Sequence, residues 1–187
     1  MPHRIITLGE IMLRLSTPGY ERFINTRSYD VIYGGAEANV AISLANWGES
    51  AAHVTVFPTN DIGKAATNTL QFAGVDTSLI QFNEGRMGIY FVENGAMQRS
   101  SKIIYDRFDS AFSNLNPDDF NWEKIFEGAD WFHWTGITPA VSQSAADLCK
   151  AAVNAASRLG VKISADINYR RNLWQYGKGP MDIMPEL

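Results

Sequence analysis

The chain has 187 residues, of which 45% are hydrophobic and 19% charged, so it can bury a sizeable core and does not have the composition of a disordered segment. Sixteen basic and twenty acidic residues give a net charge of −4, which argues against a protein that binds nucleic acid through its overall charge. The single cysteine, Cys149, excludes an internal disulfide framework and an all-cysteine metal site. With no signal-peptide pattern and no apolar run of membrane-spanning length, we expect a cytoplasmic globular protein that does not bind membranes.

Short β-branched runs alternate with helical patterns in the first part of the chain. Residues 4–8 and 53–57 are predicted to be strands, because both runs are short and apolar. Residues 35–47 are predicted to form a helix between them, which Gly48 ends. The apolar stripe of this helix is expected to consist of Ala36, Val40, Leu44 and Trp47.

The same alternation continues toward the middle of the chain. Asp61 is predicted to cap a helix that runs through Ala73 and ends at Gly74. Residues 130–134 then have the pattern of a buried strand.

A long helix is predicted after that strand, with Thr138 as its N-cap, Pro139 as its first residue and Gly160 at its end. Its apolar face is expected to consist of Val141, Ala145, Leu148, Ala152, Ala156 and Leu159. Residues 161–166 follow as another strand. Repeated strand–helix units with buried strands predict an α/β fold, with a mostly parallel sheet that helices cover.

Two segments, residues 11–33 and 88–107, do not follow this alternation. The first has no helical stripe. The second is predicted to be a β-hairpin that turns at Asn94-Gly95, a dipeptide typical of two-residue hairpin loops. Strands outside the alternation predict a small second sheet, such as a lid.

Gly34 and Gly35 open the first long helix, and Asn39 lies about one turn inside it. Glycines let a ligand approach the backbone, and a helix N-terminus offers free N–H groups. A Gly-Gly pair alone favours the alternative, a tight turn required by packing. No Walker-type phosphate loop or dinucleotide fingerprint is present to support a ligand.

Tyr90, Tyr105 and Arg107 form a second candidate group. Tyr105 and Arg107 share a strand face, and a two-residue turn would pair Tyr90 with Arg99 and place it on that same face. In this register roughly 20 Å of extended strand separates the two tyrosines, so a small ligand reaches both only if the ribbon curls or the turn is longer. The spacing is equally consistent with an aromatic sheet face beside a solvated arginine.

Asp166, Asn168 and Arg170 follow the strand at residues 161–166. Ligands of open α/β sheets bind at the carboxyl ends of parallel strands, and an arginine there can bind a carboxylate. The alternative is loop hydrogen bonding by Asp166 and Asn168, with Arg170 paired to an acid; the position favours a ligand site.

The remaining chemistry-bearing side chains are interpreted as packing or surface residues. The histidines are far apart in sequence and form no metal-ligand cluster, and no nucleophile elbow is present. This interpretation covers His3, His53, His133, Cys149, Trp122, Trp131, Trp134 and Trp174.

Several motifs in this order resemble the ribokinase-like (phosphofructokinase-B type) sugar kinases: GGAEANVAISLANWG at residues 34–48, Asn60-Asp61-Ile62-Gly63, the lid-like hairpin and DINYRRNLW at residues 166–174. Within that family the chain is most similar to 2-keto-3-deoxygluconate kinases, on Gly9-Glu10, Tyr105-Asp106-Arg107 and residues 166–170. The resemblance covers essentially the whole chain. Glu37 departs from it, because a small residue is usual there, and Pro58 stands where a glycine is usual.

The resemblance implies a ribokinase-like three-layer sandwich with a mostly parallel sheet and a small β lid, whose strands lie within residues 11–33 and 88–107. Family members are much longer, so residues 1–187 would be the N-terminal, sugar-binding part of one domain without its C-terminal half. The family's Gly-Ala-Gly-Asp motif, which carries the catalytic base, would lie beyond Leu187. We therefore expect no catalytic residue and no metal ligand in this chain, and Gly128-Ala129-Asp130 is only a superficial echo of the motif.

The resemblance also implies a sugar site, in which Arg107 and Arg170 would hold a sugar carboxylate and Asp166 would support the other residues. The implied substrate-binding residues are Gly34, Gly35, Asn39, Tyr90, Tyr105, Arg107, Asn168 and Arg170. The intact enzyme would use ATP and Mg²⁺, which this chain alone would not bind fully, and would form a homo-oligomer through the lid.

Three functions follow from these expectations. The first is the substrate-binding half of an ATP-dependent 2-keto-3-deoxygluconate kinase (2-dehydro-3-deoxygluconokinase), a carbohydrate kinase that would be inactive as this chain alone. The second is a kinase for a neutral sugar such as fructose or ribose, which would not need two arginines near the sugar. The third is a truncated, non-catalytic sugar-binding module.

Overall fold

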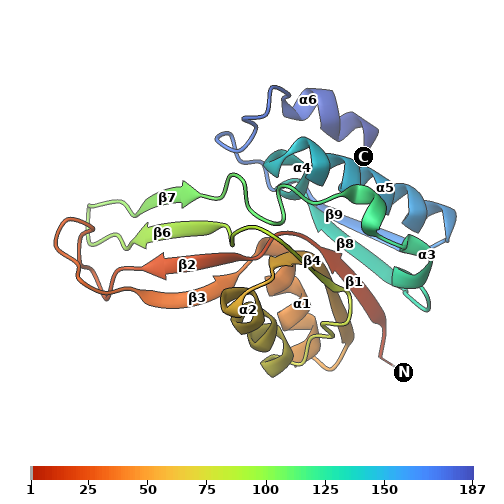
Figure 1. Ribbon diagram of the computed structural model, residues 1–187, viewed down its shortest axis with the longest axis horizontal. Helices are drawn as coiled ribbons and strands as arrows, with labels where there is room; N and C mark the ends of the chain where they lie inside the picture. The colour runs from red at the N-terminus through yellow and green to blue at the C-terminus, as the bar shows by residue number, and fades with distance from the viewer. Residues whose placement is uncertain (1) are drawn as a thin grey trace.

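Five parallel strands form the central sheet of the computed structural model, which describes residues 2–187. Their order across the sheet is β5-β4-β1-β8-β9, and every neighbouring pair is parallel (Figure 1). The strands are β1 (Arg4–Leu8), β4 (Ser50–Pro58), β5 (Ile80–Asn83), β8 (Trp131–Thr135) and β9 (Lys162–Asp166). The predicted α/β fold with a mostly parallel sheet is confirmed, and β5 is a strand that the sequence pattern does not predict.

Helices cover both faces of this sheet and make three layers (Figure 1). The helix α1 (Ala36–Asn46) and the helix α2 (Asp61–Phe72) lie on one face, and α5 (Gln143–Arg158) lies on the other. Shorter segments are α3 (Trp122–Ile125), α4 (Thr138–Val141), α6 (Pro180–Ile183) and two 3-10 turns, Pro117–Asp119 and Met184–Glu186. Among residues 2–187, no helix combines the length and the apolar character needed to cross a membrane.

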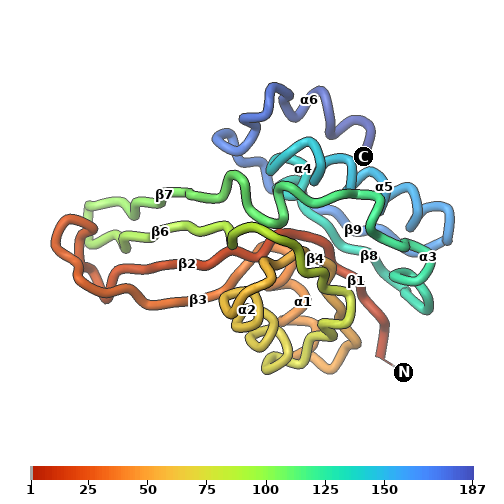
Figure 2. Tube along the Cα trace, in the orientation of Figure 1, coloured from red at the N-terminus to blue at the C-terminus, as the bar shows by residue number. Residues whose placement is uncertain are grey.

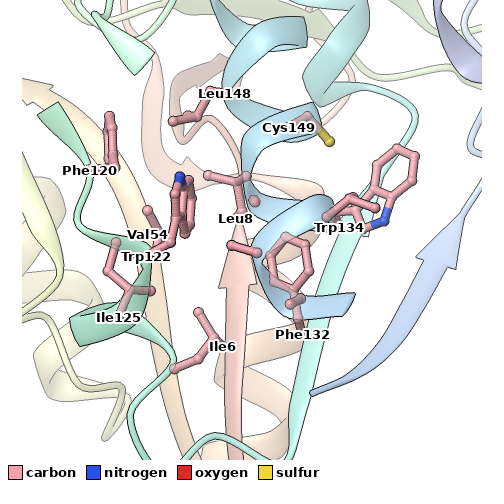
Figure 3. Packing of buried hydrophobic residues seen from close by; sticks show 14 of the residues in the cluster. Ile6, Leu8, Val54, Phe120, Trp122, Ile125, Phe132, Trp134, Leu148 and Cys149 are labelled. Carbon is pink, nitrogen blue, oxygen red and sulfur yellow. The ribbon is translucent and has the colours of Figure 1, made fainter. Parts of the chain in front are cut away.

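The larger part of the core lies between the sheet and α5 (Figure 3). Ile6 and Leu8 are two residues apart on β1, so both point to this face, where Phe132 of β8 is also fully buried. A row of aromatic rings closes the layer at α3, with neighbouring centroids 5.8, 5.5 and 5.2 Å apart. The rings in order are Phe120, Trp122, Phe126 and Phe132.

A second, four-stranded sheet extends away from the central one (Figure 2). Its order is β3-β2-β6-β7, with β2 and β6 parallel and the two outer pairs antiparallel. The strands are β2 (Met12–Ser16), β3 (Asp30–Gly34), β6 (Ile89–Glu93) and β7 (Lys102–Asp106). The segments that break the alternation thus form a separate sheet, as predicted.

The predicted register of the hairpin is wrong. Tyr90 lies opposite Tyr105, and residues 94–101 form a longer connection in place of a two-residue turn. Arg99 forms an ion pair with the Glu93 carboxylate and donates to the Tyr20 carbonyl oxygen at 2.9 Å. The Tyr20 contact ties the connection to the β2–β3 loop and the Glu93 ion pair ties it to the end of β6, so the turn preference of Asn94-Gly95 does not decide the register.

The long helix predicted from Thr138 is divided into α4 and α5. Ser142 has extended backbone, and its hydroxyl accepts the Ala145 N–H at 3.1 Å, so Ser142 starts a new helix. Thr138 does not act as the N-cap, because its hydroxyl donates to Glu37 at 2.7 Å. The predicted apolar face is otherwise buried except for Leu159.

Two further details of the predicted helices are wrong. Asn60, not Asp61, caps α2: its side-chain oxygen accepts the N–H groups of Ile62 and Gly63 at 3.0 and 3.1 Å. The buried face of α1 consists of Glu37, Ala38 and Ala41, and Trp47 of the predicted stripe is 78% exposed. Small alanines let α1 lie close to the sheet, and Ile42 and Leu44 are partly buried against the same core.

Candidate functional site

A cavity of about 170 Å³ lies where the α1 N-terminus, the carboxyl end of β1 and the second sheet meet. Seven of the eight predicted substrate-binding residues line it, and Asn168 is the exception. The lining residues are Glu10, Met12, Gly34, Gly35, Ala36, Glu37, Asn39, Tyr90, Tyr105, Arg107, Ile137, Arg170 and Leu173. The fold therefore brings together three groups of residues that are far apart in sequence.

A larger cavity of about 360 Å³ lies between α1 and the central sheet. It is mostly apolar, with Val40, Leu44 and Trp131 among its lining residues, and it contains none of the predicted site residues. The smaller cavity has the convergent polar groups that small-molecule sites use, so we assign the candidate site to it.

Gly35 is the N-cap of α1 and makes no side-chain cap, so the first N–H groups of the helix border the cavity. A Cβ atom on Gly35 would lie 2.2 Å from the Glu10 carbonyl oxygen, so close packing already requires glycine at this position. Asn39 lines the same cavity from one turn inside the helix. The packing interpretation of the glycine pair therefore holds for Gly35, and the pair also borders the candidate site.

Tyr90 and Tyr105 stack on neighbouring strands, with ring centroids 5.9 Å apart and an interplanar angle of 29°. The longer hairpin connection is what brings them together, as the sequence argument required. Burial raises the pKa of Tyr90, so at neutral pH its hydroxyl is protonated and can donate a hydrogen bond. The two rings form an aromatic wall of the cavity.

Arg107 is not the solvated arginine of the alternative interpretation, because its side chain is buried. Its Nε and Nη2 both donate to Glu10 Oε2, with Nε at 2.9 Å. The Ser110 hydroxyl donates to the other Glu10 oxygen at 2.8 Å. Arg107 therefore lies in the cavity wall with its charge already matched by Glu10.

Arg170 also lines the cavity, but it is exposed, and no carboxylate among residues 2–187 lies within ion-pair distance of it. The alternative interpretation, in which Arg170 pairs with an acid, is thus not observed among these residues. Asp166 accepts the backbone N–H of Asn168 at 2.9 Å, which is the loop role that the alternative assigned to both residues. Neither residue lines the cavity, so the structure does not bring them together with the other seven, and their role at the sugar site stays a prediction.

Glu37 and Glu10 are the two acidic wall residues that sequence reasoning did not place in the site. Glu37 is 1% exposed, and its Oε1 accepts the Thr135 N–H, the Thr135 hydroxyl and the Thr138 hydroxyl at 3.2, 2.8 and 2.7 Å. Burial outweighs these hydrogen bonds and raises the pKa of Glu37. Two features of the sequence could have pointed to these residues. A glutamate stands at position 37, where a small residue is usual in the family, and Gly9-Glu10 directly follows the first strand.

The side chains interpreted as packing residues lie outside this cavity. His53 is buried, with Nδ1 2.6 Å from the Thr7 hydroxyl oxygen, and burial lowers its pKa to about 4. Burial raises the pKa of the Cys149 thiol, so this cysteine is unreactive at neutral pH. Residues 2–187 contain no group of three acidic, histidine or cysteine side chains that could hold a metal ion.

The amino-acid sequence is similar to those of known carbohydrate kinases. Residues 2–186 match the pfkB family of carbohydrate kinases. The chain is 35% identical to the 2-dehydro-3-deoxygalactonokinase of Haloferax volcanii, in an alignment that covers 93% of the chain and 54% of that protein.

Solved structures give the same result. The 2-dehydro-3-deoxygluconokinase of Thermotoga maritima is 49% identical, with a TM-score of 0.90 over 92% of this chain and 53% of that one. A sugar kinase of Pyrococcus horikoshii in complex with ATP has a TM-score of 0.84 over 97% of this chain and 58% of that one, and at 23% identity this likeness shows the fold. The chain spans about half the length of the proteins it matches.

Proposed function

The chain belongs to the pfkB family of carbohydrate kinases, and from this premise we propose that residues 1–187 form the sugar-binding, N-terminal part of an ATP-dependent 2-dehydro-3-deoxygluconokinase. The observation that carries the proposal is the cavity at the α1 N-terminus, which combines two tyrosine hydroxyls with an arginine that has no carboxylate partner among residues 2–187. The similarity to enzymes named for 2-dehydro-3-deoxy sugar acids supports this substrate class.

The chemistry of the cavity suits a sugar acid. Arg170 supplies an uncompensated charge for the carboxylate, and a guanidinium can donate two parallel hydrogen bonds to it. Tyr90 and Tyr105 can donate to a keto oxygen or a hydroxyl, and Asn39 can both donate and accept. The backbone at Gly34 and Gly35 allows the ligand to approach the first turn of α1.

ATP and Mg²⁺ belong to the same proposal through the family and the ATP-bound relative. The described residues do not form a metal site, and the 187 residues contain no Gly-Ala-Gly-Asp motif. We therefore assign no step of phosphoryl transfer to a side chain of this chain. Its proposed contribution is to bind and orient the sugar, which is a large part of catalysis in phosphoryl transfer.

The second sheet is the proposed contact between subunits of a homo-oligomer. Its edge strands β3 and β7 expose large apolar side chains at 50–56% of their area. These are Val31, Ile32, Ile103 and Ile104. A cytoplasmic location completes the proposal, because the proposed co-substrate is ATP.

A neutral-sugar kinase is the second candidate. The observation that favours it is the Glu10–Arg107 ion pair, which leaves Arg170 as the one arginine of this cavity without a carboxylate partner among residues 2–187. A neutral sugar would need neither arginine to be free.

Calorimetric titration of the chain with 2-dehydro-3-deoxygluconate and, in parallel, with fructose tests these candidates. We expect the sugar acid to bind and fructose to bind at least tenfold more weakly, because only the acid can pair with Arg170. Preference for fructose would instead identify the neutral-sugar kinase.

Substitution of the arginines extends this test. Arg170→Ala and Arg107→Ala should each weaken sugar-acid binding by about 1.5–3 kcal/mol, the usual scale for a hydrogen bond to a charged group. Arg171→Ala is the matched control, because Arg171 is exposed and does not line the cavity. Unchanged affinity in both cavity variants would contradict the carboxylate role.

A further inference from the structure

Glu10 occupies an enclosed position in the cavity wall. The residue is 5% exposed, and Arg107 is 3% exposed. A Cβ atom on Gly88 would lie 2.6 Å from Glu10 Oε1, so the absence of a side chain there makes room for the carboxylate. One carboxylate oxygen accepts from Arg107 and the other accepts from Ser110.

The contacts of Glu10 connect the two sheets of the molecule. Glu10 follows β1 of the central sheet, and Arg107 follows β7 of the second sheet, 97 residues later. The Ser110 hydroxyl oxygen also accepts the Ser113 N–H at 3.1 Å, so the chain after β7 is fixed to the same carboxylate. The ion pair is therefore a fixed point between the sheets, directly beside the cavity.

This arrangement limits how Arg107 can meet a ligand. Its Nε and Nη2 are committed to Glu10, and its Nη1 has no hydrogen-bond partner among residues 2–187. A side chain held at two nitrogens has lost its rotamer freedom before the ligand arrives, so binding costs less ordering of the site. A buried guanidinium without its carboxylate would be an uncompensated charge, which is strongly unfavourable.

We propose that Glu10 is a positioning residue, which fixes the Arg107 guanidinium in the cavity wall so that Nη1 is presented to the sugar. The identity of the ligand rests on the proposed function, whereas the contacts between Glu10 and Arg107 are independent of it. The two arginines then have different roles. Arg107, whose charge is matched by Glu10, donates a directed hydrogen bond to the sugar, and Arg170 supplies the positive charge that pairs with the sugar carboxylate.

A double-mutant cycle on the full 187-residue chain tests this proposal. The variants are Glu10→Gln, Arg107→Met and the two combined, and Glu84→Gln is the matched control at an exposed glutamate. One readout is the exchange rate of the Arg107 Nε–H in nitrogen-15 spectra, which needs no ligand. The other readout is calorimetric affinity for 2-dehydro-3-deoxygluconate. Glu10→Asp replaces Glu10→Gln if the latter does not fold, because the shorter side chain keeps the negative charge but moves the carboxylate away from Arg107.

We expect Glu10→Gln or Glu10→Asp to speed exchange of the Arg107 Nε–H and to weaken sugar-acid binding roughly tenfold, as for loss of a charged hydrogen bond. In the Arg107→Met background the same change should alter affinity less than about twofold, because no guanidinium remains to be positioned. An unchanged Nε–H exchange rate, or an equal loss of affinity in both backgrounds, would overturn the role of Glu10. Absence of sugar-acid binding by the unsubstituted chain, with the exchange result as expected, would instead overturn the proposed function.

Discussion

Two carboxyl groups in the wall of one cavity are stabilised in opposite ways. Glu10 has a cation beside it, and its charge is matched within the fold. Glu37 has only neutral donors, two threonine hydroxyls and one backbone N–H, so burial raises its pKa. Ionisation of Glu37 therefore costs more in the folded chain than in the unfolded chain.

The pH dependence of stability should show this difference. Because the folded pKa of Glu37 is raised above the model-compound value of 4.5, folding favours the protonated acid, and stability falls as pH rises from 4.5 through the folded pKa. Glu37→Gln cannot ionise, so its free energy of unfolding relative to the unsubstituted chain should increase over this range. Urea unfolding at a series of pH values, with Glu84→Gln as control, measures the difference, and a difference that does not change with pH would contradict the assignment.

Residues of the candidate site could be predicted from the sequence where they belong to a local pattern. Gly34, Gly35 and Asn39 were found from a helix start, and Arg170 from the end of a strand. The roles of Glu10 and Glu37 could not be found in this way, because their partners lie 97 to 101 residues away. Burial of a carboxyl group depends on such distant partners and leaves no periodic signal.

At the scale of elements, strand positions were more predictable than their pairing. Residues 4–8 coincide with β1, because a short apolar run between turns is typical of a buried parallel strand. The hairpin register failed because Arg99, bonded to Glu93 and to the Tyr20 carbonyl, folds the connection back on itself. The predicted buried face of α1 was wrong because helical periodicity identifies an apolar face but does not say which face of the helix meets the sheet.

The edge strands of the second sheet lead to a prediction about assembly. Ile104 of β7 is 55% exposed, and substitution by glutamate would place a charge in the proposed contact between subunits. Light scattering at micromolar concentration should show a dimer or larger assembly for the unsubstituted chain and a monomer for Ile104→Glu. Ile62→Glu on α2 is the control, at 43% exposure, and a monomeric unsubstituted chain would contradict this proposal.

On the scale of the whole molecule, the candidate cavity lies beside a central sheet whose β9 edge is mostly exposed. The three-layer order and the separate second sheet place the cavity where the two sheets meet, and its lining residues come from positions between Glu10 and Leu173. The sequence predicts this arrangement through the alternation of strands and helices and through the two segments that break it.

Catalysis by this chain alone is not expected, because phosphoryl transfer needs a base and charge-stabilising donors against the sugar hydroxyl, and the family's motif for both is absent from the 187 residues. A coupled assay for ADP should give no sugar-dependent turnover above background. Mass spectrometry of the same sample should verify the chain length. Robust turnover would require a base within this chain, and Asp61, Asp106 and Asp166 would then be substituted in turn.

We propose that the cavity at the α1 N-terminus, and not the larger cavity beside Trp131, binds the sugar acid. Amide chemical-shift mapping of the chain during titration with 2-dehydro-3-deoxygluconate tests it most directly. We expect saturable shifts at Gly35, Tyr105 and Arg170, and none at Trp131. Shifts concentrated around Trp131 and Leu44, with the α1 N-terminus unchanged, would contradict it.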